Sequence, residues 1–157
     1  MGLLFLLTIM ATPGEMWTAL EELDLKGVVM EALEDQKEDY VKKNLEQLYQ
    51  GLNPEGEKIS PEYVPGPYRR KKNRMNPAPG EGTPDFFLTG AMYDETEAEV
   101  DGDELVIESR VEYAKYNEER WGDAEIWGLT SSNHNEFVFQ QLQPIIIEKV
   151  SQQTGLQ

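Results

Sequence analysis

Residues 111–122, VEYAKYNEERWG, bring together the side chains of this sequence that could do chemistry. Glutamates lie among tyrosines and a tryptophan, and carboxylates act as general acids and bases when a partner group gives or takes the proton. The neighbouring sequence supplies no such partner. The glutamates are therefore interpreted as the polar edge of a strand that leads into a turn, not as an acid and base pair.

Other catalytic and cofactor-binding patterns are missing as well. The chain has no cysteine and one histidine, His134, which excludes disulfides, thiolate nucleophiles and zinc sites of the His and Cys type. His134 lies in SSNHNEF, where serine and asparagine indicate a helix N-terminus instead of a catalytic triad. The stretch GEGTP lacks the lysine and the following helix of a phosphate-binding loop. The sequence thus predicts a protein that is not an enzyme and uses no cofactor.

One calcium-binding register is present, because the liganding positions of an EF-hand loop fall on Glu97, Glu99, Asp101, Gly102 and Glu108. Glutamate is too long for the first two positions, and the flanking residues alternate as strands do. A hairpin turn explains the Asp-Gly pair equally well. We therefore predict no metal site.

Acidic residues dominate the composition. There are 30 aspartates and glutamates against 14 lysines and arginines, which gives a formal net charge of -16 over 157 residues. This length suits a single domain with its own core. Most of the surface is expected to repel DNA, because it cannot neutralise phosphates. Five of the 14 basic residues cluster in one run: Arg69, Arg70, Lys71, Lys72 and Arg74.

Two long helices are predicted from apolar residues that recur at three- and four-residue steps. The first covers residues 24–50, where Asp24 caps the start and Gly51 ends the helix in the left-handed conformation. The second covers residues 133–154 and closes at Gly155, with a break or kink after Gln143 because Pro144 follows. Residues 1–23 form an N-terminal segment.

The apolar start, MGLLFLLTIMATPG, is interpreted as neither a signal peptide nor a membrane span. No lysine or arginine precedes Lys26, no cleavage site is evident, and the apolar run is about half of the ~20 residues that a span needs. Two explanations stay open: a buried first strand, or translation that starts at Met10 instead of Met1.

Residues 51–84 are predicted to be a long loop that carries the basic cluster. They hold seven of the nine prolines of the chain, so no regular element is expected to run far. Three uses of the cluster stay open: docking on the acidic surface of a neighbouring subunit, a solvated loop, or a DNA contact.

Residues 85–130 are predicted to form the sheet, with a hairpin turning at Asp101-Gly102. A two-residue loop there places Ala98 opposite Leu105, Thr96 opposite Ile107 and Met92 opposite Val111. These residues share the packed face, and Glu95, Glu97 and Glu99 point to the other face. Together the elements predict a single α/β domain of the α+β type, with an antiparallel sheet flanked by the long N-terminal helix and the C-terminal helix.

Short motifs along residues 84–128 resemble the tail-completion, or head-to-tail connector, proteins of tailed double-stranded DNA phages, a family that includes minor tail and tail-terminator proteins. The motifs are PDFFLTGAMYDE, VEYAKYNEERWG and IWGLT, and the matching positions are Thr89, Gly90, Tyr113, Ala114, Tyr116, Glu118 and Gly122. The resemblance implies an α/β fold with an antiparallel sheet, assembly as a ring in the virion beside portal, connector or tail proteins, and no catalysis.

The expected function is therefore that of a structural virion protein, a homo-oligomeric ring through which DNA passes without specific binding, and with no membrane partner. The glutamates Glu95, Glu97 and Glu99 are candidates for the channel wall. Candidates for the subunit interface are Tyr113, Tyr116, Trp121 and Trp127, together with Arg69, Arg70, Lys71, Lys72 and Arg74. Packing in the core beside the hairpin is an equal alternative for Tyr113. The alternative function is an acidic DNA-mimic inhibitor of a phage or prophage.

Overall fold

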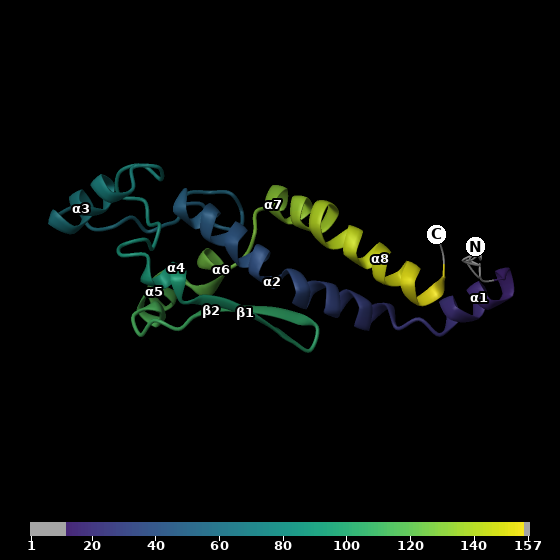
Figure 1. The fold of residues 1–157 in the computed structure, drawn as a ribbon. Helices are drawn as coiled ribbons and strands as arrows, with labels where there is room; N and C mark the ends of the chain where they lie inside the picture. Colours follow the sequence, from purple (N-terminus) through teal and green to yellow (C-terminus); the bar gives the residue numbers. More distant parts are fainter. Residues whose placement is uncertain (1–11, 156–157) are drawn as a thin grey trace, which may run out of the picture.

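The computed structural model describes residues 12–155, which form an elongated α+β structure along one long helix, α2 (Leu25–Tyr49) (Figure 1). Helix α1 (Pro13–Glu21) lies at one end of the molecule and α3 (Pro67–Met75) at the other. The C-terminal helical segment and the β-hairpin pack along different sides of α2. None of the described helices is long and apolar enough to cross a membrane. The predicted fold class is confirmed.

Helix α2 begins and ends where the sequence predicts. The Asp24 side chain accepts the Gly27 N–H at 3.0 Å and caps the start. Gly51 follows the end of the helix with a φ of 69°. This left-handed conformation favours glycine, because a residue with a side chain is strained in it. A Cβ at this position would lie 2.6 Å from the Pro79 side chain, so the residue also permits a close approach of the 51–84 segment.

Helix α1 is not predicted from the sequence, although its start carries the local signal. Thr12 and Glu15 form a capping box, in which each side chain accepts the backbone N–H of the other residue, and Pro13 follows the cap directly. The explanations offered for residues 1–11, a buried first strand or a start at Met10, lie outside the described residues.

The C-terminal helical segment runs without a break through the proline. It consists of α7 (Ser131–Glu136), the π-helical turn η1 (Phe137–Leu142) and α8 (Gln143–Thr154). Of the predicted break or kink after Gln143, the break is wrong, and the helix changes at this residue from π to α geometry. The Gln143 N–H donates to the Val138 carbonyl, five residues back, and this wider turn accommodates Pro144 in the first turn of α8.

The sheet is the two-stranded hairpin β1 (Thr96–Asp101) and β2 (Glu104–Ser109). The predicted pairing is wrong by two residues, because Ala98 lies opposite Ile107 and Thr96 opposite Ser109. The loop residues are Gly102 and Asp103 instead of Asp101 and Gly102, with the positive φ of 63° at the first loop position. A shift of this size keeps the side chains of residues 96–101 and 104–109 on their predicted faces.

Three predicted regions change their secondary structure. Met92 lies in helix α4 (Ala91–Asp94), not in a strand opposite Val111. Residues 111–122, expected to be a strand and turn, contain helix α5 (Ala114–Trp121), and α6 (Asp123–Ile126) follows it. The predicted 51–84 loop contains helix α3, which starts at Pro67, a residue that favours the first helical position. The sheet therefore occupies only the 96–109 part of residues 85–130.

Two apolar clusters pack against α2. One lies between α2 and the C-terminal segment and contains Ala32, Leu129, Phe137 and Leu142, with the rings of Tyr40 and Phe137 edge to face at 5.1 Å. The other lies at the α3 end and contains Leu48, Ile59, Tyr63, Phe86, Met92, Ala114, Trp121 and Ile126.

Two buried amides of α2 join these clusters. The Asn44 side chain donates to the carbonyls of Ile126 and Gly128 at 3.2 and 2.7 Å. The Gln47 side chain donates to the Gly128 carbonyl at 3.1 Å and accepts the Thr130 N–H at 2.8 Å. Because buried backbone groups need partners, these bonds fix residues 126–130 on α2.

Replacing Gln47 with alanine is expected to lower the free energy of unfolding by about 1–3 kcal/mol, because the partly buried Thr130 N–H loses its acceptor. Chemical denaturation measures this loss. Gln153→Ala is the matched control, since Gln153 is exposed on α8, and its effect should stay within about 0.5 kcal/mol. Equal effects of the two substitutions would contradict this role of Gln47.

Candidate functional site: an aromatic and basic surface at the α3 end

A buried ion pair lies beneath α3. The ammonium of Lys72 pairs with the carboxylate of Asp85 and also donates to the Phe87 carbonyl, while Lys72 is 3% and Asp85 1% exposed. Asp85 also accepts the Asn76 side-chain amide at 2.9 Å and the Phe87 N–H at 3.1 Å. A buried ion pair is tolerated when its remaining hydrogen bonds are satisfied. Burying only one of the two charges, without its partner, would strongly destabilise the fold.

Further bonds connect this pair to α2 and α4. The Asn76 amide donates to the Tyr49 carbonyl at the end of α2, at 2.8 Å, and the Tyr93 hydroxyl of α4 donates to the Asp85 carbonyl at 2.6 Å. The Asp85 side chain and the Phe87 N–H close a local turn around Phe86, whose φ of 53° is unusual for a large side chain. The pair therefore fixes α3 against both neighbouring elements.

Burial shifts the pKa values of these groups. Burial lowers the pKa of Lys72, and Asp85 opposes this effect. Burial, followed by the negative charge of Asp85, raises the pKa of Tyr63, Tyr68 and Tyr93. A lysine with a lowered pKa can serve as a base or nucleophile. Here the ammonium is enclosed and already bonded, so its role is structural.

The outward face of α3 carries exposed cations that could contact another molecule. Arg70, Lys71 and Arg74 are exposed, and none of them pairs with a carboxylate in the described part of the chain. Tyr68 and Met75 flank them and are 48% and 39% exposed. Arg69 instead pairs with Glu62 at 3.0 Å and Glu81 at 3.5 Å in its own chain.

Helix α5 shares a pocket with Tyr68, at the start of α3, and adds aromatic side chains. A shallow pocket of about 350 Å³ is lined by Tyr63, Val64, Tyr68, Tyr116, Asn117, Arg120 and Trp121. Tyr116 is 58% and Tyr113 41% exposed, and the Arg120 guanidinium lies 4.6 Å from the centre of the Trp121 ring. The structure thus brings Tyr68, which directly precedes the basic run, to the aromatic motif more than 40 residues later in the sequence.

Several predicted interface residues are already used inside the subunit. Lys72 is buried as described, and Trp121 is 8% exposed, with its N–H donated to the Pro61 carbonyl at 2.7 Å. Trp127 is partly buried against the α3-end cluster and donates to Glu118 at 3.1 Å. The exposed residues Tyr113, Tyr116, Arg70, Lys71 and Arg74 are the ones that a partner can reach.

The three predicted channel glutamates do not form one exposed row. Glu95 caps the end of α4 instead of standing in the strand, and Glu97 is partly buried and pairs with Arg110. Glu99 is exposed on β1. Their assignment to a channel wall stays a prediction.

A groove separates α2 from β1 and has a volume of about 780 Å³. Apolar side chains line it (Val41, Leu45, Tyr49, Tyr93 and Ala98), and charged ones accompany them (Glu38, Glu46, Glu97, Glu99, Lys37 and Lys42). The helical spacing of Val41, Leu45 and Tyr49 indicates this face in the sequence, but the hairpin that completes the groove cannot be placed from it.

His134 and the EF-hand register, the other candidate sites in the sequence, can also be located in the structure. His134 is exposed in α7, whose first turn is capped by Thr130, as expected for a helix N-terminus. Within residues 12–155 no three histidine, aspartate or glutamate side chains are placed to hold a metal ion. The residues of the EF-hand register lie on the two strands of the hairpin and in its turn.

No family model, curated protein or solved structure matches this chain. The surface at the α3 end, an exposed basic helix beside exposed aromatic side chains, has the composition of a site for protein contacts, in which tyrosine, tryptophan and arginine are enriched.

Lys72→Met is expected to lower the free energy of unfolding by about 3–5 kcal/mol, because it leaves the Asp85 carboxylate buried without its cation. Lys71→Met is the matched control on the same helix, since Lys71 is exposed, and should change stability by no more than about 0.5 kcal/mol. Denaturant titration of both variants measures the difference, and a mild effect of Lys72→Met would contradict a structural role for the pair.

Alkaline pH is expected to destabilise the fold. Tyr63 and Tyr93 have raised pKa values in the folded state, so their contribution is present below the ordinary pKa of 10.0 and is lost as the pH rises above it. The lowered pKa of Lys72 acts in the opposite direction, and its contribution grows as the pH rises towards 10.5. Because two tyrosines oppose one lysine, the free energy of unfolding should fall as the pH rises above the ordinary tyrosine pKa of 10.0.

The Tyr93→Phe variant should lose stability less steeply above pH 10, by up to about 1.4 kcal/mol per pH unit, which corresponds to one proton. Unfolding free energies measured at a series of alkaline pH values give both slopes, and parallel curves for wild type and Tyr93→Phe would contradict the assignment.

Proposed function

We propose that this protein is a structural, non-enzymatic subunit that assembles into a ring, and that the ring is a head-to-tail connector or tail-completion component of a tailed phage virion through which DNA passes. The observation that supports this proposal best is the separation of charge. An exposed basic helix, α3, lies at one end of a molecule whose other exposed surfaces are largely acidic.

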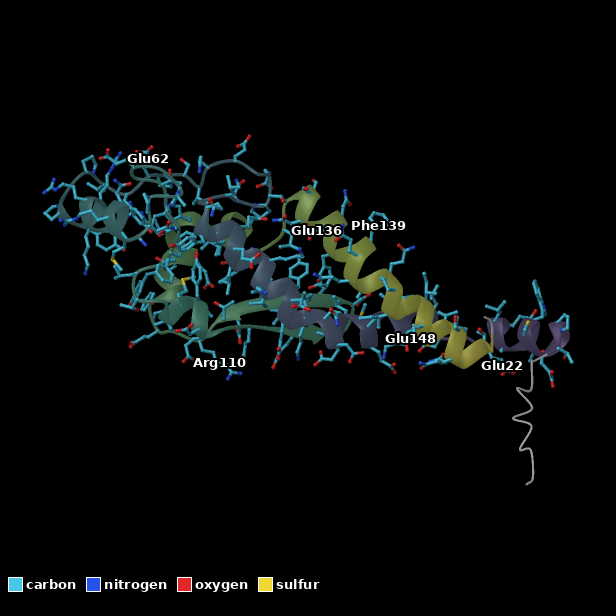
Figure 2. The ribbon with its side chains drawn as sticks, turned by 45° about the horizontal axis from the view of Figure 1, so that its top comes forward. Glu22, Glu62, Arg110, Glu136, Phe139 and Glu148 are labelled. Carbon is cyan, nitrogen blue, oxygen red and sulfur yellow. The ribbon has the colours of Figure 1, made fainter. Side chains whose placement is uncertain are left out.

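Most cations outside α3 are paired within the chain. Lys26 pairs with Asp103, Lys43 with Glu136, Arg110 with Glu97, Lys37 with Glu34, and Lys149 with both Glu31 and Asp35. Many exposed acids nevertheless remain on α2 and the hairpin, among them Glu38, Asp39, Glu99, Asp101 and Glu104. Figure 2 shows Glu62 at the α3 end and Glu22 towards the opposite end of the molecule.

Contacts between a basic patch and an acidic patch at different places on one molecule are heterologous. Such contacts repeat from subunit to subunit and close into a ring when the rotation permits. Exposed aromatic residues beside the basic patch, above all Tyr116 at 58% exposure, add apolar area to the same contact. A ring with this composition keeps an overall negative charge, which favours the passage of DNA over its binding.

The motif resemblance of residues 84–128 supports the virion role, since a connector ring needs subunit contacts and no catalysis. The acidic DNA-mimic function depends on the same net charge but predicts a monomer or dimer that competes with DNA for a host protein. The three exposed cations of α3 oppose this alternative, because a mimic of phosphates gains nothing from them.

The purified protein is expected to form a discrete oligomer whose dissociation is promoted by salt, because contacts between exposed charges weaken with ionic strength. Sedimentation velocity over a range of protein and salt concentrations measures this. A sample that stays monomeric at low salt and high concentration would contradict the proposal. Competition with DNA by such a monomer would favour the mimic instead.

A further inference from the structure

We infer that the groove between α2 and β1 is the docking site for helix α3 of a second copy of this chain. This inference rests on the proposed assembly function and names the two surfaces that meet. The basis is that an apolar groove with an acidic excess and a basic helix with apolar flanks lie at separate places on one subunit. Three carboxylates of the groove and three cations of the helix form no ion pair within the described residues.

The groove has the chemistry to receive a basic helix. Four carboxylates and two ammonium groups line it, around the apolar side chains of Val41, Leu45 and Ala98. Glu38, Glu46 and Glu99 are exposed, and none of them forms an ion pair within the described residues. Their charges are therefore free to attract a cationic partner.

Helix α3 has the complementary chemistry. Arg70, Lys71 and Arg74 are exposed and unpaired in the described part of the chain, and Tyr68 and Met75 provide exposed apolar area beside them. The Lys72 and Asp85 pair holds the inner face of the helix, so the cations are presented outwards on a fixed support. A preorganised helix loses little conformational entropy on docking.

The dimensions also agree. A helix of nine residues is about 13 Å long, and the part of α2 that lines the groove, from Lys37 to Gln50, is about 20 Å long at the rise of an α-helix. Figure 1 shows α3 beyond the end of α2, away from the hairpin of its own subunit. The contact is thus made between copies, and its two halves differ, as ring closure requires.

Charge reversal tests the contact from both sides. The helix variant Arg70→Glu, Lys71→Glu, Arg74→Glu and the groove variant Glu38→Lys, Glu46→Lys, Glu99→Lys should each lose the oligomer and sediment as monomers. An equimolar mixture of the two should form hetero-oligomers that contain both variants, because the basic helix of the groove variant fits the acidic groove of the helix variant, and the acidic helix of the helix variant fits the basic groove of the groove variant. The combined six-fold variant should recover the oligomer.

The matched control is Asp101→Lys, Asp103→Lys, Glu104→Lys, which makes the same change in charge at the hairpin tip, outside the groove. It should retain the oligomer. Circular dichroism and thermal unfolding confirm that each variant keeps its fold. An oligomer that survives the groove variant, or a mixture without hetero-oligomers, would overturn the docking inference while the assembly function stands. A monomeric wild type would overturn both.

Site-specific crosslinking gives an independent readout, because the chain has no cysteine. Lys71→Cys and Glu99→Cys variants, mixed and treated with a short thiol crosslinker, should give a covalent dimer. The pair Lys71→Cys and Asp103→Cys is the control and should give little. A dimer of equal yield in both mixtures would contradict docking in the groove.

Discussion

The buried pair of Lys72 and Asp85 is the constraint on which the α3 end depends. Its ammonium and carboxylate are stable away from water only together, and the carboxylate also holds the Asn76 amide and the Phe87 N–H. Further bonds, from the Asn76 amide to the Tyr49 carbonyl and from the Tyr93 hydroxyl to the Asp85 carbonyl, connect α3 and Asp85 to the end of α2 and to α4. Because Lys72 faces inwards, Arg70, Lys71 and Arg74 face solvent, and the helix presents a cationic surface in one defined orientation.

The long helix α2 serves two different surfaces. One side carries the buried amides of Asn44 and Gln47, which bind the backbone of residues 126–130 and thereby position the C-terminal segment. Another side, with Val41, Leu45 and Tyr49, faces the hairpin across the groove. The same helix therefore organises the core and forms a wall of the proposed docking site. A rigid wall of this kind is suited to a repeated subunit contact, because its geometry stays the same from one copy to the next.

Most residues of the candidate surface could be predicted from the sequence. Which of them are buried and which are exposed could not. The run RRKKNR predicts a charged surface, yet it does not distinguish Lys72, which is buried, from Lys71, which is exposed. The signals for a helix were present, since Pro67 precedes nine residues without glycine or proline. The sequence gives no sign of the role of Asp85. A single aspartate among apolar residues matches no motif, and only the tertiary structure places Lys72 beside it.

Local chemistry determined the elements whose signals lie within a few residues: the cap at Asp24 and the end of α2 at Gly51, the hairpin with its two faces, and the C-terminal helix. The tertiary structure decided the rest. Packing against Tyr63 and Phe86 placed Trp121 in a helix where a strand was expected, and a π turn carried the chain past Pro144. The physical reason is that contacts between distant residues contribute more free energy than the local preferences they override. The same contacts brought the hairpin beside α2 and created the groove.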